Sequence, residues 1–404
     1  MKKPYLIYII AFGIFGIINT ELGVVGILPQ ITELYGISAA QAGMLVSSFA
    51  LIIAIFGPFM TLLFSGFNHK KIMAWVLAIF IISNLISAFA PNYTVLLFVR
   101  IIPAFLHPVY FSVAFVAAAN SVPKDQSTKA ASKVFIGLSV GMVLGIPITS
   151  FIANQFSLEA AFLFSAAVNA LAFIGIVALL PSMPVTVKLS YKKQLGILKK
   201  PQIWLSVATV AFIPAAICSV YSYFAEYLGK ITLMSGKEIS AMLILFGASG
   251  VLGNLIAGKL LSKSVIRTTV LFPIVLSIIY LLVYYLGAFT IPMILIIVVW
   301  GILFTSGLNI SQNWLISEAS EAPEFANGLF VSFSNLGIAL GTALGGLFIA
   351  HMGIQQVIWS GIIFLVLAFV SISLRVKLFG PNRQLTSVHI ESKDYANIPK
   401  VRPN

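Results

Sequence analysis

The chain has 404 residues, of which 60% are hydrophobic and 9% are charged, and its formal net charge is +13. A soluble domain of this length does not need so much apolar side chain, so the composition excludes a soluble globular protein and predicts an all-α membrane protein. The chain has one cysteine, Cys218, and therefore cannot form an intrachain disulfide.

Apolar stretches of 18 or more residues recur along the whole chain, and each is long enough to cross a membrane as a helix. The twelve expected spans are 5–28, 41–64, 72–90, 94–119, 129–153, 159–181, 203–227, 237–260, 267–286, 290–317, 325–350 and 355–378. They predict a six-helix bundle over 1–181, a linker over 182–202, a second bundle over 203–379 and a disordered tail over 380–404. The lysine-rich linker is expected to form an amphipathic helix on the membrane surface.

Two of these spans each carry three glycines at i, i+4 and i+8, and the two sets lie 200 residues apart. The glycines are Gly137, Gly141, Gly145, Gly337, Gly341 and Gly345. This spacing places small residues in one stripe along a helix, where a second helix packs closely, and Pro147 is expected to bend the first of the two helices. Two pseudo-symmetric copies of one bundle, with a substrate path between them, are typical of a secondary transporter.

The basic residues are distributed unevenly over the two sides of the membrane. If the N-terminus is cytoplasmic, all Lys and Arg residues except Lys230, Lys237 and Arg100 belong to cytoplasmic loops or termini. This asymmetry predicts a multi-pass protein of the cell membrane with both termini in the cytoplasm. Contact with anionic lipid accounts for the positive charge, so we expect lipid and not nucleic acid as a partner. The protein is expected to be a monomer.

Glu21 follows Asn19 and Thr20 in the first span, about seven residues before that span ends and so roughly 10 Å below the surface. A carboxylate at this depth costs on the order of 3 kcal/mol unless it is paired, protonated or in contact with water. We therefore expect Glu21 to take part in proton coupling, with Asn19 and Thr20 as substrate-binding candidates. The alternative is a structural acid that bonds to a neighbouring helix.

Arg100 and His107 are two further polar residues inside a span. Arg100 lies roughly 9 Å from the same surface as Glu21, so the two side chains are expected to pair. His107 follows on the same helix face, and an imidazole changes its charge near neutral pH, which suits a proton relay. The alternatives are that Arg100 reaches back to the outer headgroups and that His107 is a plain hydrogen-bond partner between helices.

The second half has an unusually polar stretch within its span 290–317, at 305–313 (TSGLNISQN). Uncharged amides and hydroxyls are tolerated in a span where they face protein or water. They are expected either to line a substrate cavity or to act as packing contacts between helices. The substrate-binding candidates in this half are Tyr221, Tyr223, Trp300, Asn309 and Asn313.

Three acids, Glu318, Glu321 and Glu324, form a loop that faces the basic inner surface. They are expected either to pair with that surface when the inner gate closes or to remain a solvated group of charges.

The stretch 253–260 (GNLIAGKL) resembles a phosphate-binding loop, but it has Leu260 where Ser or Thr would bind magnesium, and it ends a spanning helix. No cofactor or metal is therefore predicted, and transport is expected to use the proton gradient.

Several motifs are similar to those of a known family. Residues 19–29 (NTELGVVGILP) resemble a first-span signature, Arg100 matches the arginine of a fourth-span motif, and 106–108 (LHP) resembles the histidine segment after it. Residues 142–147 (MVLGIP) match a fifth-span antiporter motif, whereas the loop 65–71 (SGFNHKK) lacks the usual Asp. On these residues the chain resembles the major facilitator superfamily, in particular the sugar-efflux and arabinose-polymer-efflux branch of the drug:proton antiporters.

This resemblance implies two bundles that rock about a central site and export a small organic solute, such as a drug, a sugar or a related metabolite, in exchange for protons. An enzyme is not expected, because the four histidines are scattered. The alternatives are uptake by proton symport, or a receptor or enzyme that does not transport but keeps the same fold.

Overall fold

The computed structural model describes residues 5–37, 39–185 and 190–379, and these residues are helical with no strand. Twelve of its helical segments are long and apolar enough to cross a membrane, which confirms the expected all-α membrane fold. The expected disordered tail at 380–404 lies outside the described residues. The crossing helices are α1 (Leu6–Gly23), α3 (Ala39–Phe64), α4 (His69–Ala88), α5 (Tyr93–Asn120), α6 (Ser127–Gln155), α7 (Leu158–Leu179), α9 (Pro201–Tyr221), α11 (Gly236–Lys263), α12 (Val265–Leu286), α13 (Thr290–Ile316), α14 (Pro323–Met352) and α15 (Val357–Phe379).

The first expected span is interrupted. Helix α1 ends at Gly23, a 3₁₀ turn follows over Val24–Ile27, and a separate short helix, α2 (Leu28–Tyr35), begins there. Pro29 lies in the first turn of α2, where the missing N–H of proline costs no helical hydrogen bond. The apolar composition continues across the break, so hydropathy alone does not reveal it.

The expected span 203–227 is interrupted at the equivalent place in the second half, where α9 ends and α10 (Phe224–Lys230) begins. The two residues of this break are tied to α14: the Ser222 and Thr342 hydroxyls lie 2.9 Å apart, and the Tyr223 hydroxyl donates to the Thr342 carbonyl at 2.9 Å. Glu226 and Lys230 of α10 form an ion pair of 2.7 Å.

The two glycine stripes lie at close helix contacts. A Cβ on Gly137 of α6 would collide with the Ala11 carbonyl of α1, and a Cβ on Gly337 of α14 would collide with the Ala211 carbonyl of α9. The α1–α6 contact is thus repeated by the α9–α14 contact with a shift of 200 residues. Backbone approaches backbone at both contacts, which only glycine permits.

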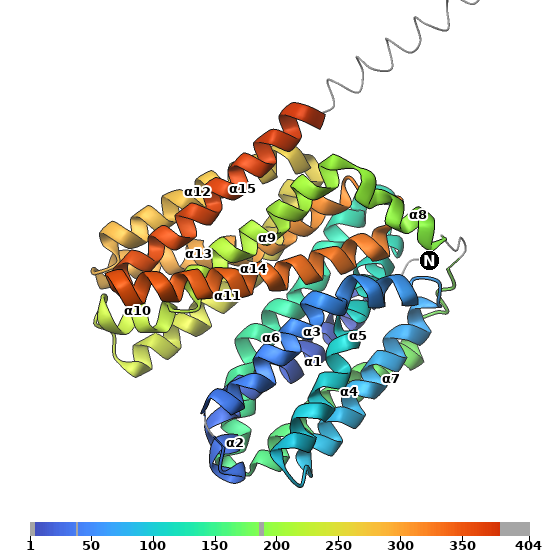
Figure 1. The fold of residues 1–404 in the computed structure, drawn as a ribbon, viewed down its shortest axis with the longest axis horizontal. Helices are drawn as coiled ribbons and strands as arrows, with labels where there is room; N and C mark the ends of the chain where they lie inside the picture. Colours follow the sequence, from blue (N-terminus) through green and yellow to red (C-terminus); the bar gives the residue numbers. More distant parts are fainter. Residues whose placement is uncertain (1–4, 38, 186–189, 380–404) are drawn as a thin grey trace, which may run out of the picture.

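The two halves form separate bundles that meet at one end (Figure 1). That end carries the short helix α8 (Tyr191–Leu195) and is called the linker end here; the end with α2 and α10 is called the far end. The helix expected in the linker is short: the described part of the linker forms α8 and the 3₁₀ turn Gly196–Lys199. The Gln194 side chain of α8 is buried and donates to the Ser65 hydroxyl at 2.8 Å.

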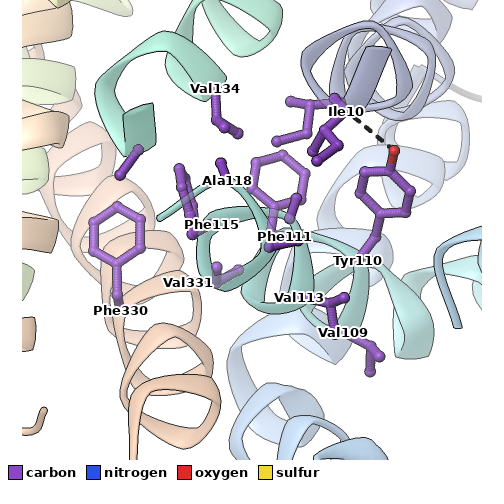
Figure 2. Packing of buried hydrophobic residues seen from close by; sticks show 14 of the residues in the cluster. Ile10, Val109, Tyr110, Phe111, Val113, Phe115, Ala118, Val134, Phe330 and Val331 are labelled. Atoms are coloured by element: carbon purple, nitrogen blue, oxygen red, sulfur yellow. Dashed lines mark hydrogen bonds between the residues drawn. The ribbon is translucent and has the colours of Figure 1, made fainter. Parts of the chain in front are cut away.

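The hydrophobic core follows this arrangement. One cluster runs through both bundles near the linker end, where the Phe330 ring of α14 lies 6.3 Å from the Phe115 ring and 6.2 Å from the Phe135 ring of the first bundle (Figure 2). The second bundle has its own cluster along its length, and a third cluster lies in the first bundle toward the far end. A Cβ on Gly43, near the far end of α3, would meet no atom within 4 Å. The bundles are therefore packed together at the linker end and diverge toward the far end.

Candidate functional site

Helices α1 and α5 bring Glu21 and His107 into direct contact. Glu21 Oε2 lies 3.1 Å from His107 Nε2, and the two side chains are 13% and 4% exposed. The imidazole stacks on Phe111 at a centroid distance of 4.4 Å, and the edge of Phe49 lies against it at 6.0 Å. The pair thus lies in largely apolar surroundings, which exclude most water, while Glu21 keeps limited access to solvent.

Arg100 does not pair with Glu21, so that expectation was wrong. Its Nη2 donates instead to the backbone carbonyl of Thr20 at 2.9 Å, and the side chain is buried. The reason is the early end of α1: the N–H of Val24 bonds to the Leu22 carbonyl, so the carbonyl of Thr20 lacks its usual helical donor. A buried guanidinium also favours the negative end of a helix dipole. Arg100 therefore stabilises the end of the helix that carries Glu21.

Asn19 and Thr20 are buried within the first bundle. The Asn19 amide donates to the Ser165 hydroxyl of α7 at 3.0 Å. The Thr20 hydroxyl accepts from Asn84 of α4 at 3.0 Å and from Asn169 of α7 at 2.9 Å. These bonds hold α1 in a rotation that directs Glu21, the next residue, toward α5. In this conformation, Asn19 and Thr20 thus orient the acid.

The aromatic candidates of the second half belong to one cluster. The Tyr221 ring lies 4.9 Å from Phe246 and 4.6 Å from Phe304, and Trp300 packs against Phe246 at 5.5 Å. Trp300, a substrate-binding candidate from the sequence, is 1% exposed and therefore belongs to the core of the second bundle. Tyr221 remains half-buried. Tyr223 bonds to α14, as described above.

The two amides of α13 lie where the bundles meet. The Ser132 hydroxyl of α6 donates to Asn309 Oδ1 at 3.0 Å, and the Asn313 amide donates to the same oxygen at 3.0 Å. Asn309 is fully buried, and its Nδ2 has no hydrogen-bond partner among the described residues. In this conformation the amides therefore act as a packing contact between the bundles, and separation of the linker end would expose them.

Glu324, the third acid of the predicted acidic loop, contacts a residue of the first bundle that the sequence did not indicate as its partner. His69 Nε2 at the start of α4 lies 3.3 Å from Glu324 Oε1 at the start of α14. Among the ion pairs between described residues, this pair is the one that joins the two bundles. The Ser112 hydroxyl of α5 donates to the Glu324 backbone carbonyl at 2.6 Å, which strengthens the same contact. His69 belongs to the loop that lacks the usual Asp.

The other two acids of the loop are also paired, so the alternative of a solvated group of charges was wrong. Glu318 lies 2.7 Å from Arg375, whose guanidinium stacks on the Trp314 ring at 3.6 Å. Glu321 pairs with Lys200. Partial burial acts to raise the pKa of Glu321, but the hydrogen bond and charge of Lys200 outweigh it, so the pKa lies below the ordinary 4.5. Arg375 is a buried residue of α15, although the sequence analysis counted it among the cytoplasmic basic residues.

Two similar helix bundles, packed together at one end and with a buried acid–imidazole pair in one of them, are typical of a membrane transporter.

The chain belongs to the major facilitator superfamily, whose family model matches residues 5–330. It is 31% identical over 346 residues to the inner membrane transport protein YdhP of Escherichia coli (strain K12), covering 86% of this chain and 89% of that protein. It is 25% identical over 376 residues to the probable sugar efflux transporter of Mannheimia succiniciproducens, covering 93% and 94%. The fold matches FucP in the outward conformation with a TM-score of 0.74 at 14% identity, covering 92% and 99%.

The family identified from the motifs is thus confirmed, and its members are transporters, not enzymes. The family also indicates that the ligand is a small solute.

Proposed function

We propose that the protein is a proton-coupled exporter of a small organic solute that works by alternating access between its two bundles. The observation that carries this proposal is the Glu21–His107 contact, because an ionisable pair inside a membrane helix bundle is costly to keep and marks a proton or ion path. The name of one relative, a probable sugar efflux transporter, supports the direction of transport.

The geometry supports a proton-binding role for Glu21. Its carboxylate faces an imidazole, keeps limited solvent access, and is held in place by bonds on both preceding residues. In the proposed cycle, Glu21 takes up a proton through the open far end. It releases the proton after the far end has closed and the linker end has opened. In this conformation His107 is the side chain that contacts the carboxylate.

The positive-inside orientation would place the linker end in the cytoplasm. The conformation would then be open outward, with the inner gate closed by Phe330 and by the His69–Glu324 pair. The aromatic surface around Tyr221 is the proposed contact of the solute in the second bundle. The cycle needs no cofactor besides the proton gradient.

Counterflow in proteoliposomes tests the proposal. A panel of sugars, nucleosides and drugs is first screened for exchange without a pH gradient, and each exchanged solute is then followed with a gradient of one unit. An antiporter concentrates the solute in vesicles that are acidic inside, about tenfold for one proton per neutral solute. Concentration in vesicles that are alkaline inside would show symport, and no flux of any solute would favour a receptor.

Cysteine labelling tests the orientation. In a Cys218→Ser background, Glu33→Cys at the far end and Lys192→Cys at the linker end are both exposed positions. An impermeant maleimide should label intact cells at position 33 and not at position 192. The opposite pattern would place the linker end outside and reverse the proposed cycle.

A further inference from the structure

One lysine lies on the membrane-facing side of α6. This helix is held between α1, on its Gly137 side, and α11 and α13, on its Ser132 and Ser139 side. The stripe between these two contact faces consists of Lys133, Ile136, Val140, Leu144 and Phe151. Leu144 is 41% exposed and Phe151 is 61% exposed, as expected for side chains that meet lipid. Lys133 therefore lies at a position that otherwise meets lipid.

The Lys133 ammonium lies beside an aromatic ring. It forms no ion pair in the part of the chain that the structure describes, and its Nζ lies 5.7 Å from the centre of the Tyr8 ring. It lies six residues after the start of α6, roughly 9 Å along the helix. A charged ammonium at this depth extends toward the headgroups and favours an anionic partner there.

Two apolar grooves lie on either side of Tyr8, the residue whose ring Lys133 contacts. The first, of about 320 Å³, runs between α1 and α6 and is lined by Tyr8, Phe12, Phe15, Ile136, Gly137 and Val140. The second, of about 400 Å³, runs between α1 and α7 on the other side of Tyr8 and Phe12. Tyr8 and Phe12 thus form a ridge with an apolar groove on each side and a cation at its linker end. This arrangement matches a lipid with two acyl chains and one negative headgroup.

The internal repeat provides a comparison within the molecule. The α1–α6 contact corresponds to the α9–α14 contact with a shift of 200 residues, so Ala208 and Phe333 occupy the places of Tyr8 and Lys133. The second copy keeps the glycine contact without a lysine or tyrosine. The fold therefore does not require the Lys133–Tyr8 pair, and the pair calls for a separate explanation.

We propose that Lys133 and the two grooves beside Tyr8 and Phe12 form a binding site for an anionic phospholipid of the leaflet at the linker end. The acyl chains lie on either side of the Tyr8–Phe12 ridge, and the phosphate lies against the Lys133 ammonium. Basic positions between membrane helices are known to select anionic headgroups by charge. The lipid would cover α1, the helix that carries Glu21, along its exposed face.

Native mass spectrometry of the full chain in neutral detergent tests the proposal. Phosphatidylglycerol and phosphatidylcholine with the same acyl chains are titrated in parallel against the wild type, Lys133→Gln and Lys133→Arg. The matched control is Lys263→Gln, which removes an exposed lysine at the linker end of α11, away from both grooves. Thermal unfolding shows that each variant is folded.

The wild type should prefer phosphatidylglycerol about fivefold, the size expected for one lysine near a headgroup. Lys133→Gln should lose this preference, whereas Lys133→Arg and Lys263→Gln should keep it. An unchanged preference for phosphatidylglycerol in Lys133→Gln would overturn the proposal, and so would equal binding of the two lipids by the wild type. Competition by soluble glycerol phosphate at equal concentration would show a site for a free anion and would likewise overturn the lipid assignment.

Discussion

The two bundles pack alike along their glycine stripes but differ beside them. In the first bundle, Glu21 of α1 contacts His107 of α5. In the second bundle the shift of 200 residues places Tyr221 of α9 at the position of Glu21, and its ring contacts Phe304 of α13 at 4.6 Å. An acid–imidazole contact in one copy is thus an aromatic contact in the other.

This difference shows how a repeated fold can divide two tasks. The stripes hold the helix backbones together, and a Cβ on Gly137 or Gly337 would collide with a backbone carbonyl, so glycine is kept at this contact in both copies. The side chains beside these contacts are not restricted in this way and can differ between the two copies. We infer that the first bundle handles the proton, while the second offers an aromatic surface to the solute.

The largest expected effect distinguishes the role of Glu21 from that of Tyr221. Glu21→Gln keeps the shape of the side chain but removes its ionisable group, so pH-driven accumulation should fall from about tenfold per pH unit to none. Downhill counterflow should persist. The matched change Tyr221→Phe should keep proton-driven accumulation and alter the apparent affinity for solute. Proteoliposome transport measures both, and a wild-type gradient in Glu21→Gln would show that the acid is structural.

The two glycine stripes are expected to differ in how well they tolerate an added side chain. A Cβ on Gly341 would collide with the Ala215 carbonyl, whereas a Cβ on Gly141 would meet mainly the Ile18 side chain, which can move. Overpacking of this kind costs about 1–3 kcal/mol when the neighbour cannot give way. Gly341→Ala should therefore lower the thermal unfolding temperature more than Gly141→Ala. Equal losses in the two variants would mean that the backbones adjust equally in both copies.

The His69–Glu324 pair should hold the two bundles together at the linker end. His69→Gln removes the imidazole that contacts Glu324 while keeping a polar side chain, and it should raise the population with an open linker end several-fold, as for a contact worth about 1 kcal/mol. Spin labels at Lys71 and Lys263, both exposed, would report longer distances. Glu226→Gln, which breaks a pair within the second bundle, is the control. Unchanged distances in His69→Gln would exclude a gating role.

The smallest expected effect concerns the Lys200–Glu321 pair, whose side chains are 39% and 35% exposed. Because the pKa of Glu321 in the fold lies below its ordinary 4.5, the pair contributes stability above that value and loses it as the pH falls through the lowered pKa. The difference in thermal stability between the wild type and Glu321→Gln should thus be present at pH 7 and vanish in acid. A difference that grows in acid would contradict the assigned direction.

The membrane spans were readable from the sequence because length and apolar composition determine them locally. The breaks after Gly23 and Tyr221 were missed, since the chain remains apolar through the first and the second depends on bonds to Thr342 of another helix. Glycine spacing indicated close helix contacts but not their partners.

The candidate site was only partly readable. Glu21 and His107 stood out because ionisable groups are rare in spans, but depth alone does not give the rotation of a helix. The sequence therefore paired Glu21 with Arg100, which binds a carbonyl freed by the end of α1. The contact of His69 with Glu324 joins residues of different bundles and depends on how the bundles meet. No local pattern contains that information.

The contact of Phe330 with Phe115 and Phe135 has a consequence for temperature. Opening the linker end would expose these rings to water, so the step should have a positive heat-capacity change, as expected when apolar surface becomes hydrated. Hydrophobic association weakens on cooling. The balance between the two ends of the transporter should therefore depend on growth temperature, with the closed linker end losing part of its advantage in the cold.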